Sequence, residues 1–334
     1  MVVQTHISAY KGKTVAVDTY SWLHKACCAC AAELCQNIET DVYVKFCMTR
    51  VQLLVSHGVI PLMVFDGRYL PAKEAKEKQR AASRSYNLLQ AQKLMKIGNL
   101  SGADKLFQKC VDVTPAMAHR FIRALRKSNI SYIVAPYEAD AQLAYLANQG
   151  YAHAVITEDS DLLTFGVKEV LLKMDKTGAC QSLRMSRVNL LRTINLQSFT
   201  HEMFVMMCVL SGCDYLASLR GMGLKTSYKV VEAHKTEESI LNSLSQTHQN
   251  FSPDYRQSFH QAVLTFKHQT VFCPKLKKLV PLNPYPQGQT NADFAFAGPF
   301  FDDQVAFKTI EHGNVTNALS FASSPATADK FHFN

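Results

Sequence analysis

Short apolar runs rich in β-branched residues alternate with longer helical patterns over the first half of the chain. This alternation constrains the fold more than any other feature. The runs cover residues 14–17, 59–65, 130–135, 154–157 and 170–173. Strands separated by helices imply βαβ crossovers, so the sequence predicts an α/β fold with a mostly parallel central sheet flanked by helices.

Proline, glycine and capping residues delimit several helices. Thr114-Pro115 is typical of a helix start, and Pro136 and Gly150 bracket a helix over residues 137–148. After Asp175 the alternation stops, and we expect helices over 200–210 and 224–234 with a turn-rich stretch between them. We divide the chain into regions 1–175, 176–280 and 281–334, the last of which is rich in Pro, Asn, Gly and Phe and is expected to wrap the surface and be partly flexible.

Composition excludes several classes of protein. With 334 residues, 47% of them hydrophobic and 19% charged, the chain has enough apolar residues for a large core, which excludes disorder, collagen and coiled coil. No apolar run approaches a membrane span, so no membrane partner is expected. Ten scattered cysteines favour reduced thiols and an intracellular protein. Cys27 and Cys30 have zinc-ligand spacing, but no second pair follows, so buried helix residues are the better interpretation.

Positive charge is concentrated in one segment. Residues 73–127 hold thirteen Lys and Arg against four Asp and Glu. The net charge of this segment is therefore +9, which equals the net charge of the whole chain. A single basic segment on an otherwise neutral chain is typical of a polyanion-binding element, because Lys and Arg displace the counterions of phosphates. A solvated helical face is the alternative that charge alone leaves open.

Three predicted strands end in an aspartate: Asp18, Asp66 and Asp159. The carboxyl ends of parallel strands line one edge of a sheet, so these side chains should converge. Asp161 lies on the same side as Asp159 if the chain stays extended. Glu138 and Asp140 can join them only at the first turn of a helix, where Pro136 places them.

A cluster of carboxylates needs counter-charge to stay ionised. Oxygen ligands select Mg²⁺ or Mn²⁺ over zinc, and two such ions about 4 Å apart would support phosphodiester hydrolysis. For any single strand-end aspartate, capping of the following helix is the alternative.

The motifs resemble a known family. The matching blocks, in order, are VAVDTYSWLH from Val15, VFDG from Val64, APYEADAQLAY from Ala135, ITEDSDLL from Ile156 and LSGCDY from Leu210. Together they resemble the structure-specific 5′ nucleases of the flap endonuclease and exonuclease 1 family, and most of all its exonuclease 1 group. The resemblance implies a PIN-like 5′ nuclease core with a basic helical arch over about 71–128 and a helix-two-turn-helix over about 202–234.

The resemblance also implies residue roles. The implied metal ligands are Asp18, Asp66, Glu138, Asp140, Asp159, Asp161 and Asp214, holding two Mg²⁺ ions that Mn²⁺ can replace. Lys73 and Arg80 match catalytic residues at the base of the arch, and their spacing of seven places them on one helix face. Tyr20 and His24 match DNA-contacting residues beside the active site, although His24 alone is also compatible with a core histidine.

The helix-two-turn-helix adds two further sites by resemblance. Gly221 and Gly223 would leave backbone N–H groups at a helix start free to meet a DNA phosphate. Ser211, Ser218 and Met222 would bind a monovalent cation, K⁺ or Na⁺, through hydroxyl and carbonyl oxygens.

The implied function is a Mg²⁺-dependent 5′→3′ double-stranded DNA exonuclease with 5′-flap endonuclease activity, acting in the nucleus as a monomer in mismatch repair, end resection and recombination. Its DNA partner is a duplex with a 5′ end, nick, gap or flap; mismatch-repair proteins are further implied partners, although the usual long tail and sliding-clamp box are absent. Relatives open with a Met-Gly-Ile-x-Gly-Leu segment, whereas this chain opens with Met1-Val-Val-Gln-Thr. A DNA-binding scaffold with weakened catalysis is therefore one alternative, and an RNA-directed nuclease is another.

Overall fold

The computed structural model describes residues 2–190, 194–249, 251–304 and 306, and its centre is a seven-stranded sheet. The strand order is β1-β7-β6-β5-β2-β3-β4. The strands are β1 (Val2–His6), β2 (Thr14–Asp18), β3 (Ile60–Phe65), β4 (Ser131–Val134), β5 (Ala154–Ile156), β6 (Glu169–Leu172) and β7 (Ala179–Arg184). Strands β4, β3, β2, β5 and β6 are parallel, and β7 and β1 extend the sheet in antiparallel fashion.

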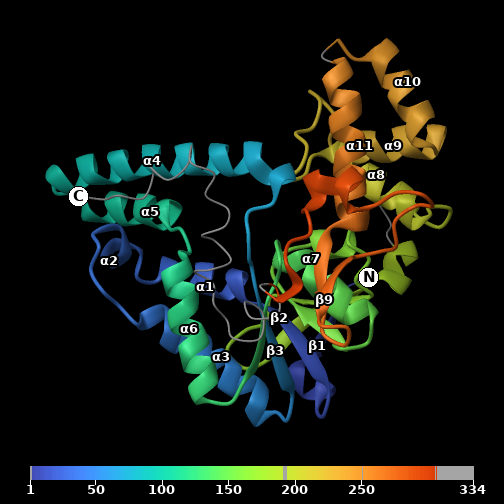
Figure 1. Cartoon of the computed structure of the whole chain (residues 1–334). Helices are drawn as coiled ribbons and strands as arrows, with labels where there is room; N and C mark the ends of the chain where they lie inside the picture. The colour runs from blue at the N-terminus through green and yellow to red at the C-terminus, as the bar shows by residue number, and fades with distance from the viewer. Residues whose placement is uncertain (1, 191–193, 250, 305, 307–334) are drawn as a thin grey trace.

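Helices cover both faces of this sheet (Figure 1). One apolar cluster joins the sheet to α1 (Thr19–Cys28), α2 (Ala31–Cys35), α3 (Val42–Ser56) and α6 (Pro115–Lys127). The other joins it to α7 (Ala139–Asn148), α8 (His201–Ser211), α9 (Leu224–His234), α10 (Glu237–Thr247) and α11 (Pro253–His268). The central strands are buried on both sides, which explains why they are continuous apolar runs rather than alternating ones.

The basic segment divides into two parts. Helices α4 (Glu74–Lys96) and α5 (Leu100–Cys110) form an antiparallel pair that extends from one end of the molecule (Figure 1). Only Ala91 of α4 is buried, whereas Phe107 of α5 packs into the core beside α2. Helix α6 buries Phe121 and Leu125 and belongs to the core layer. The α4–α5 pair is therefore the part of the segment that stands away from the sheet.

A two-stranded hairpin and a wrapping segment complete the described fold. Strands β8 (Thr270–Cys273) and β9 (Lys278–Pro281) follow α11 and pair antiparallel. The 3₁₀ helix η5 (Asn291–Ala297) buries Phe294. Farther along, the Tyr137 hydroxyl donates to the carbonyl of Pro299 at 2.6 Å, and the Arg68 guanidinium lies over the Phe301 ring. The remainder of the predicted wrapping region, residues 307–334, lies outside the described residues.

The structure confirms the mostly parallel sheet and corrects several details. Strands β7, β8 and β9 lie after Asp175, where we expected only helices and loops; β7 and the hairpin mix polar and apolar residues, so their pattern is weak. Helix α7 begins at Ala139 rather than residue 137 because Glu138 is its N-cap. Asp161 is not extended but begins a 3₁₀ turn, η3 (Asp161–Leu163).

The structure bears on two expectations from the sequence, free cysteine thiols and the absence of a membrane-spanning segment. All ten cysteines are free. Cys27 and Cys30 are both buried, as expected, but only Cys27 is a helix residue, in α1, whereas Cys30 lies in the turn before α2 as its N-cap. In the described ranges, no helix combines the length and apolar character needed to cross a membrane.

Candidate active site at the carboxyl edge of the sheet

The loop after β3 brings Asp66 to the start of α7. Gly67 donates its N–H to the Tyr137 carbonyl at 2.7 Å, so two distant segments run in direct contact. A Cβ at Gly67 would lie 1.8 Å from the Ala135 carbonyl oxygen, so no other residue fits here without displacing backbone. The glycine that follows the strand-end aspartate therefore allows the approach that places Asp66 beside the first turn of α7.

Two of the strand-end aspartates also cap helices. Asp18 Oδ1 accepts the N–H of Ser21 in α1 at 3.2 Å, and Asp66 Oδ1 accepts the N–H of Ala139 at 2.7 Å. The second oxygen of Asp18 accepts the Thr157 hydroxyl at 2.8 Å. Capping and convergence are thus not exclusive: each cap fixes one oxygen and the orientation of the whole carboxylate.

The segment after β5 carries the next pair of acids. Thr157 is buried and its hydroxyl accepts the N–H of Asp159 at 3.0 Å, while Asp159 Oδ1 accepts the N–H of Asp161 at 2.8 Å. Glu158 faces elsewhere, with its carboxylate 3.7 Å from the Lys25 ammonium. The opposite orientation of Glu158 agrees with the sequence expectation, although Asp161 reaches the same side through a turn.

The acids lie close enough to raise one another's pKa, in addition to the larger effect of burial. Burial raises the pKa of Asp66 to about 7, and the charges of Asp18 and Glu138 contribute. Burial raises the pKa of Asp161 to about 6, with contributions from Asp159 and Asp214. The pKa of Asp140 lies well above its usual value because of burial and the charges of Asp18, Glu138 and Asp159. Such a cluster is stabilised by any cation placed within it.

Two cations from the base of α4 enter this cluster. The Lys73 ammonium lies 2.5 Å from Glu138 Oε1 and 3.0 Å from Asp214 Oδ2. The Arg80 guanidinium lies 2.8 Å from the same Asp214 oxygen. Burial opposes the charged form of Lys73, but the carboxylates outweigh burial and raise its pKa. Asp214 likewise keeps a lowered pKa because the cations outweigh its burial.

The donor set fits hard divalent cations in kind and charge, since it consists of carboxylate oxygens only. In the described part of the chain, however, no three His, Cys, Asp or Glu side chains are arranged to hold a metal ion as they stand. Lys73 and Arg80 already supply positive charge to Glu138 and Asp214. The carboxylates are thus gathered at one edge but not closed around a common point.

Comparison with known proteins agrees with this geometry. The XPG N-terminal domain matches residues 1–87, and the XPG I-region matches residues 129–214. DNA damage-inducible protein DIN7 of Saccharomyces cerevisiae is 36% identical over 291 residues, which cover 86% of this chain and 68% of DIN7. The chain belongs to the XPG family of structure-specific 5′ nucleases. The family resemblance of the sequence blocks is thereby confirmed.

The exonuclease 1 relatives are longer than this chain. Exonuclease 1 of Xenopus laevis is 45% identical over 315 residues, which cover 93% of this chain and 43% of that protein. The chain therefore spans about two fifths of that relative's length. The Holliday junction-resolving enzyme GEN1, solved in complex with product DNA and a Mg²⁺ ion, has a TM-score of 0.53 at 16% identity, covering 82% of this chain and 64% of GEN1. This likeness confirms the fold.

Tyr20 and His24 lie on α1, next to the carboxylate edge. Burial raises the pKa of Tyr20, with contributions from the charges of Asp66 and Asp112, so its hydroxyl stays protonated. His24 is exposed, so the alternative of a core histidine is wrong. Both residues therefore lie on the helix that Asp18 caps.

The predicted helix-two-turn-helix consists of α8, α9 and the turns between them. Gly223 is the N-cap of α9 and Gly221 has a φ of +83°; a Cβ at either would find nothing within 4 Å. Their backbone is therefore open to an approaching group. The Ser211 hydroxyl donates to the Cys208 carbonyl at 2.8 Å, Ser218 packs against Gly212, and the Met222 side chain is buried.

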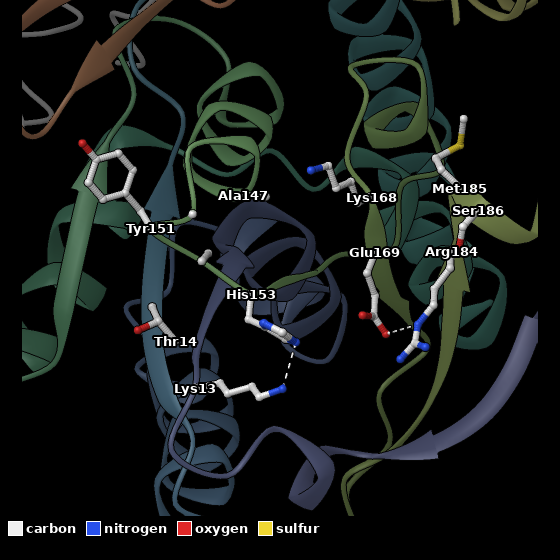
Figure 2. Close-up of a pocket in the computed structure, with 12 residues that line it drawn as sticks. Lys13, Thr14, Ala147, Tyr151, His153, Lys168, Glu169, Arg184, Met185 and Ser186 are labelled. Atoms are coloured by element: carbon white, nitrogen blue, oxygen red, sulfur yellow. Dashed lines mark hydrogen bonds and ion pairs between the residues drawn. The ribbon is translucent and has the colours of Figure 1, made fainter. Parts of the chain in front are cut away.

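A hollow of about 750 Å³ lies at the opposite edge of the sheet (Figure 2). It is lined by residues at the starts of β2 and β6 and at the end of β7, including Thr14, Glu169 and Arg184. Glu169 Oε1 there accepts the Tyr10 hydroxyl at 2.6 Å and Arg184 Nε at 2.9 Å. No predicted site residue lines this hollow, so we do not assign the active site to it despite its size.

Sequence reasoning missed three residues of the acidic edge: Thr157, Tyr215 and Gln269. Tyr215 donates to Glu138 Oε2 at 2.5 Å, and Gln269 Nε2 donates to the same oxygen at 2.9 Å. Tyr215 follows Asp214 and could have been suspected from that position. Gln269 carries no sequence signal, because it comes from the end of α11.

Proposed function

We propose that this chain is a Mg²⁺-dependent 5′→3′ double-stranded DNA exonuclease with 5′-flap endonuclease activity that acts in DNA repair. One observation carries the proposal: carboxylates from five separate segments gather at the carboxyl edge of the sheet, and Lys73 and Arg80 of the α4 base reach into them. Ligands bind at this edge in open parallel sheets.

The residues of the edge have distinct roles in this proposal. Asp18, Asp66, Glu138, Asp140, Asp159, Asp161 and Asp214 hold two Mg²⁺ ions, directly or through water. A pair of such ions supplies a nucleophilic water at neutral pH and charge for the leaving oxygen. Lys73 and Arg80 exchange their carboxylate contacts for the scissile phosphate, which they orient and partly neutralise.

The helix-two-turn-helix binds the duplex away from the cleaved end. The backbone at Gly221 and Gly223 has open space where a Cβ would be, at the start of α9, where a phosphate oxygen is favoured. Ser211, Ser218 and the Met222 carbonyl bind K⁺ or Na⁺ beside it. Contacts of this kind fix register on the duplex without reading bases. We place the protein in the nucleus, with mismatch-repair proteins as partners.

The α4–α5 pair guides the 5′ strand toward the acids. Its base carries Lys73, Lys76 and Arg80, all of which face Asp214 within 4 Å. When DNA phosphates replace Asp214 as the partner of these three cations, the phosphates release their counterions. DNA binding should therefore weaken steeply as the salt concentration rises.

Cleavage of defined DNA ends tests the proposal. The chain is incubated with 5′-labelled flap, nicked and blunt duplexes in Mg²⁺, in EDTA, and with excess RNA competitor. We expect mononucleotides from the nicked and blunt duplexes and a short oligonucleotide from the flap, in Mg²⁺ only and unaffected by RNA. Absence of product from all three DNA substrates would overturn the assignment.

A DNA-binding scaffold is the second candidate. The observation that favours it is that Lys73 and Arg80 occupy the carboxylates and that, within the described residues, no three side chains stand ready for a metal. In the same experiment a scaffold would retain the flap duplex in a gel-shift assay while releasing no labelled product. A nuclease would both bind the flap duplex and release labelled product.

A further inference from the structure

One oxygen of Glu138 is held by two donors from outside the predicted site. The Tyr215 hydroxyl lies 2.5 Å from Glu138 Oε2, and the Gln269 amide nitrogen lies 2.9 Å from the same atom. Gln269 Nε2 is also 3.2 Å from the Tyr215 oxygen. The three side chains therefore form a closed hydrogen-bonded triangle around Oε2, whereas Oε1 contacts only the Lys73 ammonium in the described residues.

Burial of Gln269 leaves its amide oxygen unsatisfied. Its side chain has no exposed surface, and among the described residues its Oε1 has no hydrogen-bond partner. The orientation of the amide is fixed, because a carboxylate only accepts and so requires the NH₂ group to face it. A buried amide oxygen without a partner destabilises a fold. The contact with Glu138 is thus kept although the other end of the amide stays unsatisfied.

The Tyr215 ring is held in place by packing against an aromatic neighbour. Its ring packs edge-on against Phe266 of α11, with centroids 4.9 Å apart. Because Phe266 and Gln269 lie at the same end of α11, one helix terminus supports both donors. The end of α11 is thereby tied to the start of α7, the helix that carries Glu138 and Asp140.

We propose that Tyr215 and Gln269 are positioning residues that hold Oε2 of Glu138, so that Oε1 alone is presented to the cation of the site. Lys73 is the cation on Oε1 in this structure. Outer partners of this kind fix the orientation of a ligating carboxylate, and their loss typically lowers metal affinity or activity about 10- to 100-fold. The inference rests on the proposed function, since it gives Glu138 a ligand's task.

Matched variants isolate the two hydrogen bonds. Tyr215→Phe removes the hydroxyl that contacts Glu138, and its control, Tyr255→Phe, removes a buried hydroxyl that has no partner in the described residues. Gln269→Met removes the amide. Its control, Gln142→Met, removes an equally buried amide that, among the described residues, bonds only the Phe272 backbone.

Two readouts separate positioning from folding. Mn²⁺ binding to each full chain is titrated by electron paramagnetic resonance, and kcat and KM are measured on a 5′-flap duplex; the melting temperature is recorded for each variant. We expect Tyr215→Phe and Gln269→Met each to weaken Mn²⁺ binding and lower kcat by about 10- to 100-fold with KM little changed. Tyr255→Phe and Gln142→Met should keep both values, even where Gln142→Met melts at a lower temperature.

The outcomes distinguish this inference from the proposed function. If the wild type cleaves DNA and both Glu138-side variants keep its Mn²⁺ affinity and kcat, the inference is overturned and the nuclease assignment stands. If the wild type does not cleave but Tyr215→Phe still weakens Mn²⁺ binding, the positioning role holds and the nuclease assignment fails. Equal losses in Gln269→Met and Gln142→Met would show a merely structural effect and also overturn the inference.

Discussion

The Lys73 ammonium lies 3.0 Å from the Asp214 carboxylate, which joins the base of α4 to the turn that follows α8. Arg80 reaches the same oxygen at 2.8 Å. The arch and the helix-two-turn-helix, which we propose to contact different parts of the DNA, therefore meet at one carboxylate. In the proposed function, phosphate binding at Lys73 and Arg80 would release Asp214 to bind Mg²⁺.

Removing the cation at the arch base should slow cleavage more than binding. For Lys73→Ala we expect kcat on a flap duplex to fall about 10²- to 10³-fold, since a charge aimed at the reacting phosphate acts mainly in the transition state. Steady-state kinetics and a binding isotherm in Ca²⁺ check this. Lys96→Ala, an exposed lysine at the far end of α4, should stay within about threefold of the wild type. Equal effects of the two substitutions would contradict the assigned role.

Gly67 should tolerate no side chain. In Gly67→Ala the new Cβ would meet the Ala135 carbonyl oxygen, so the backbone must shift and Asp66 must move with it. We expect the free energy of unfolding to fall by about 1–3 kcal/mol, measured by urea denaturation, with loss of cleavage. A Gly67→Ala chain as stable as the wild type would show that the loop does not pack as described.

Gly223 should behave in the opposite way. Its φ is −88° and nothing lies within 4 Å of a Cβ built there, so Gly223→Ala should leave the free energy of unfolding within about 0.5 kcal/mol. DNA affinity, measured by fluorescence anisotropy on a long duplex, should nevertheless fall, because the methyl group stands where a phosphate would approach. Unchanged affinity would remove Gly223 from the DNA interface.

His268 should make stability depend on pH. Burial lowers its pKa, assisted by the charge of Lys267, and its Nδ1 lies 3.0 Å from the Asn283 carbonyl. The unfolded histidine, with a pKa of about 6.5, binds a proton before the folded one does, so this contribution to stability is present above that pH and is lost below it. The difference in unfolding free energy between wild type and His268→Gln should shrink from pH 8 to pH 5.5. A difference independent of pH would mean that His268 does not titrate abnormally.

The sequence carried enough to predict the parallel strands and the convergence of Asp18, Asp66 and Asp159, because strand ends in a parallel sheet share an edge. The pattern could not reveal Asp214, Lys73 or Arg80, which the family resemblance supplied. It also could not reveal Gln269, because its contact with Glu138 depends on how α11 packs against α7. The edge strand β1 and strand β9 of the hairpin were missed since partly exposed strands carry mixed residues.

Substitution of Asp159 tests the central claim most directly. Asp159 is exposed, and its side chain makes one hydrogen bond, to the N–H of Asp161, in the described residues, so Asp159→Ala should fold normally. The account predicts that Asp159→Ala binds a 5′-labelled flap duplex about as tightly as the wild type and releases no product in Mg²⁺. Cleavage at the wild-type rate by Asp159→Ala would contradict a carboxylate-held metal site at this edge.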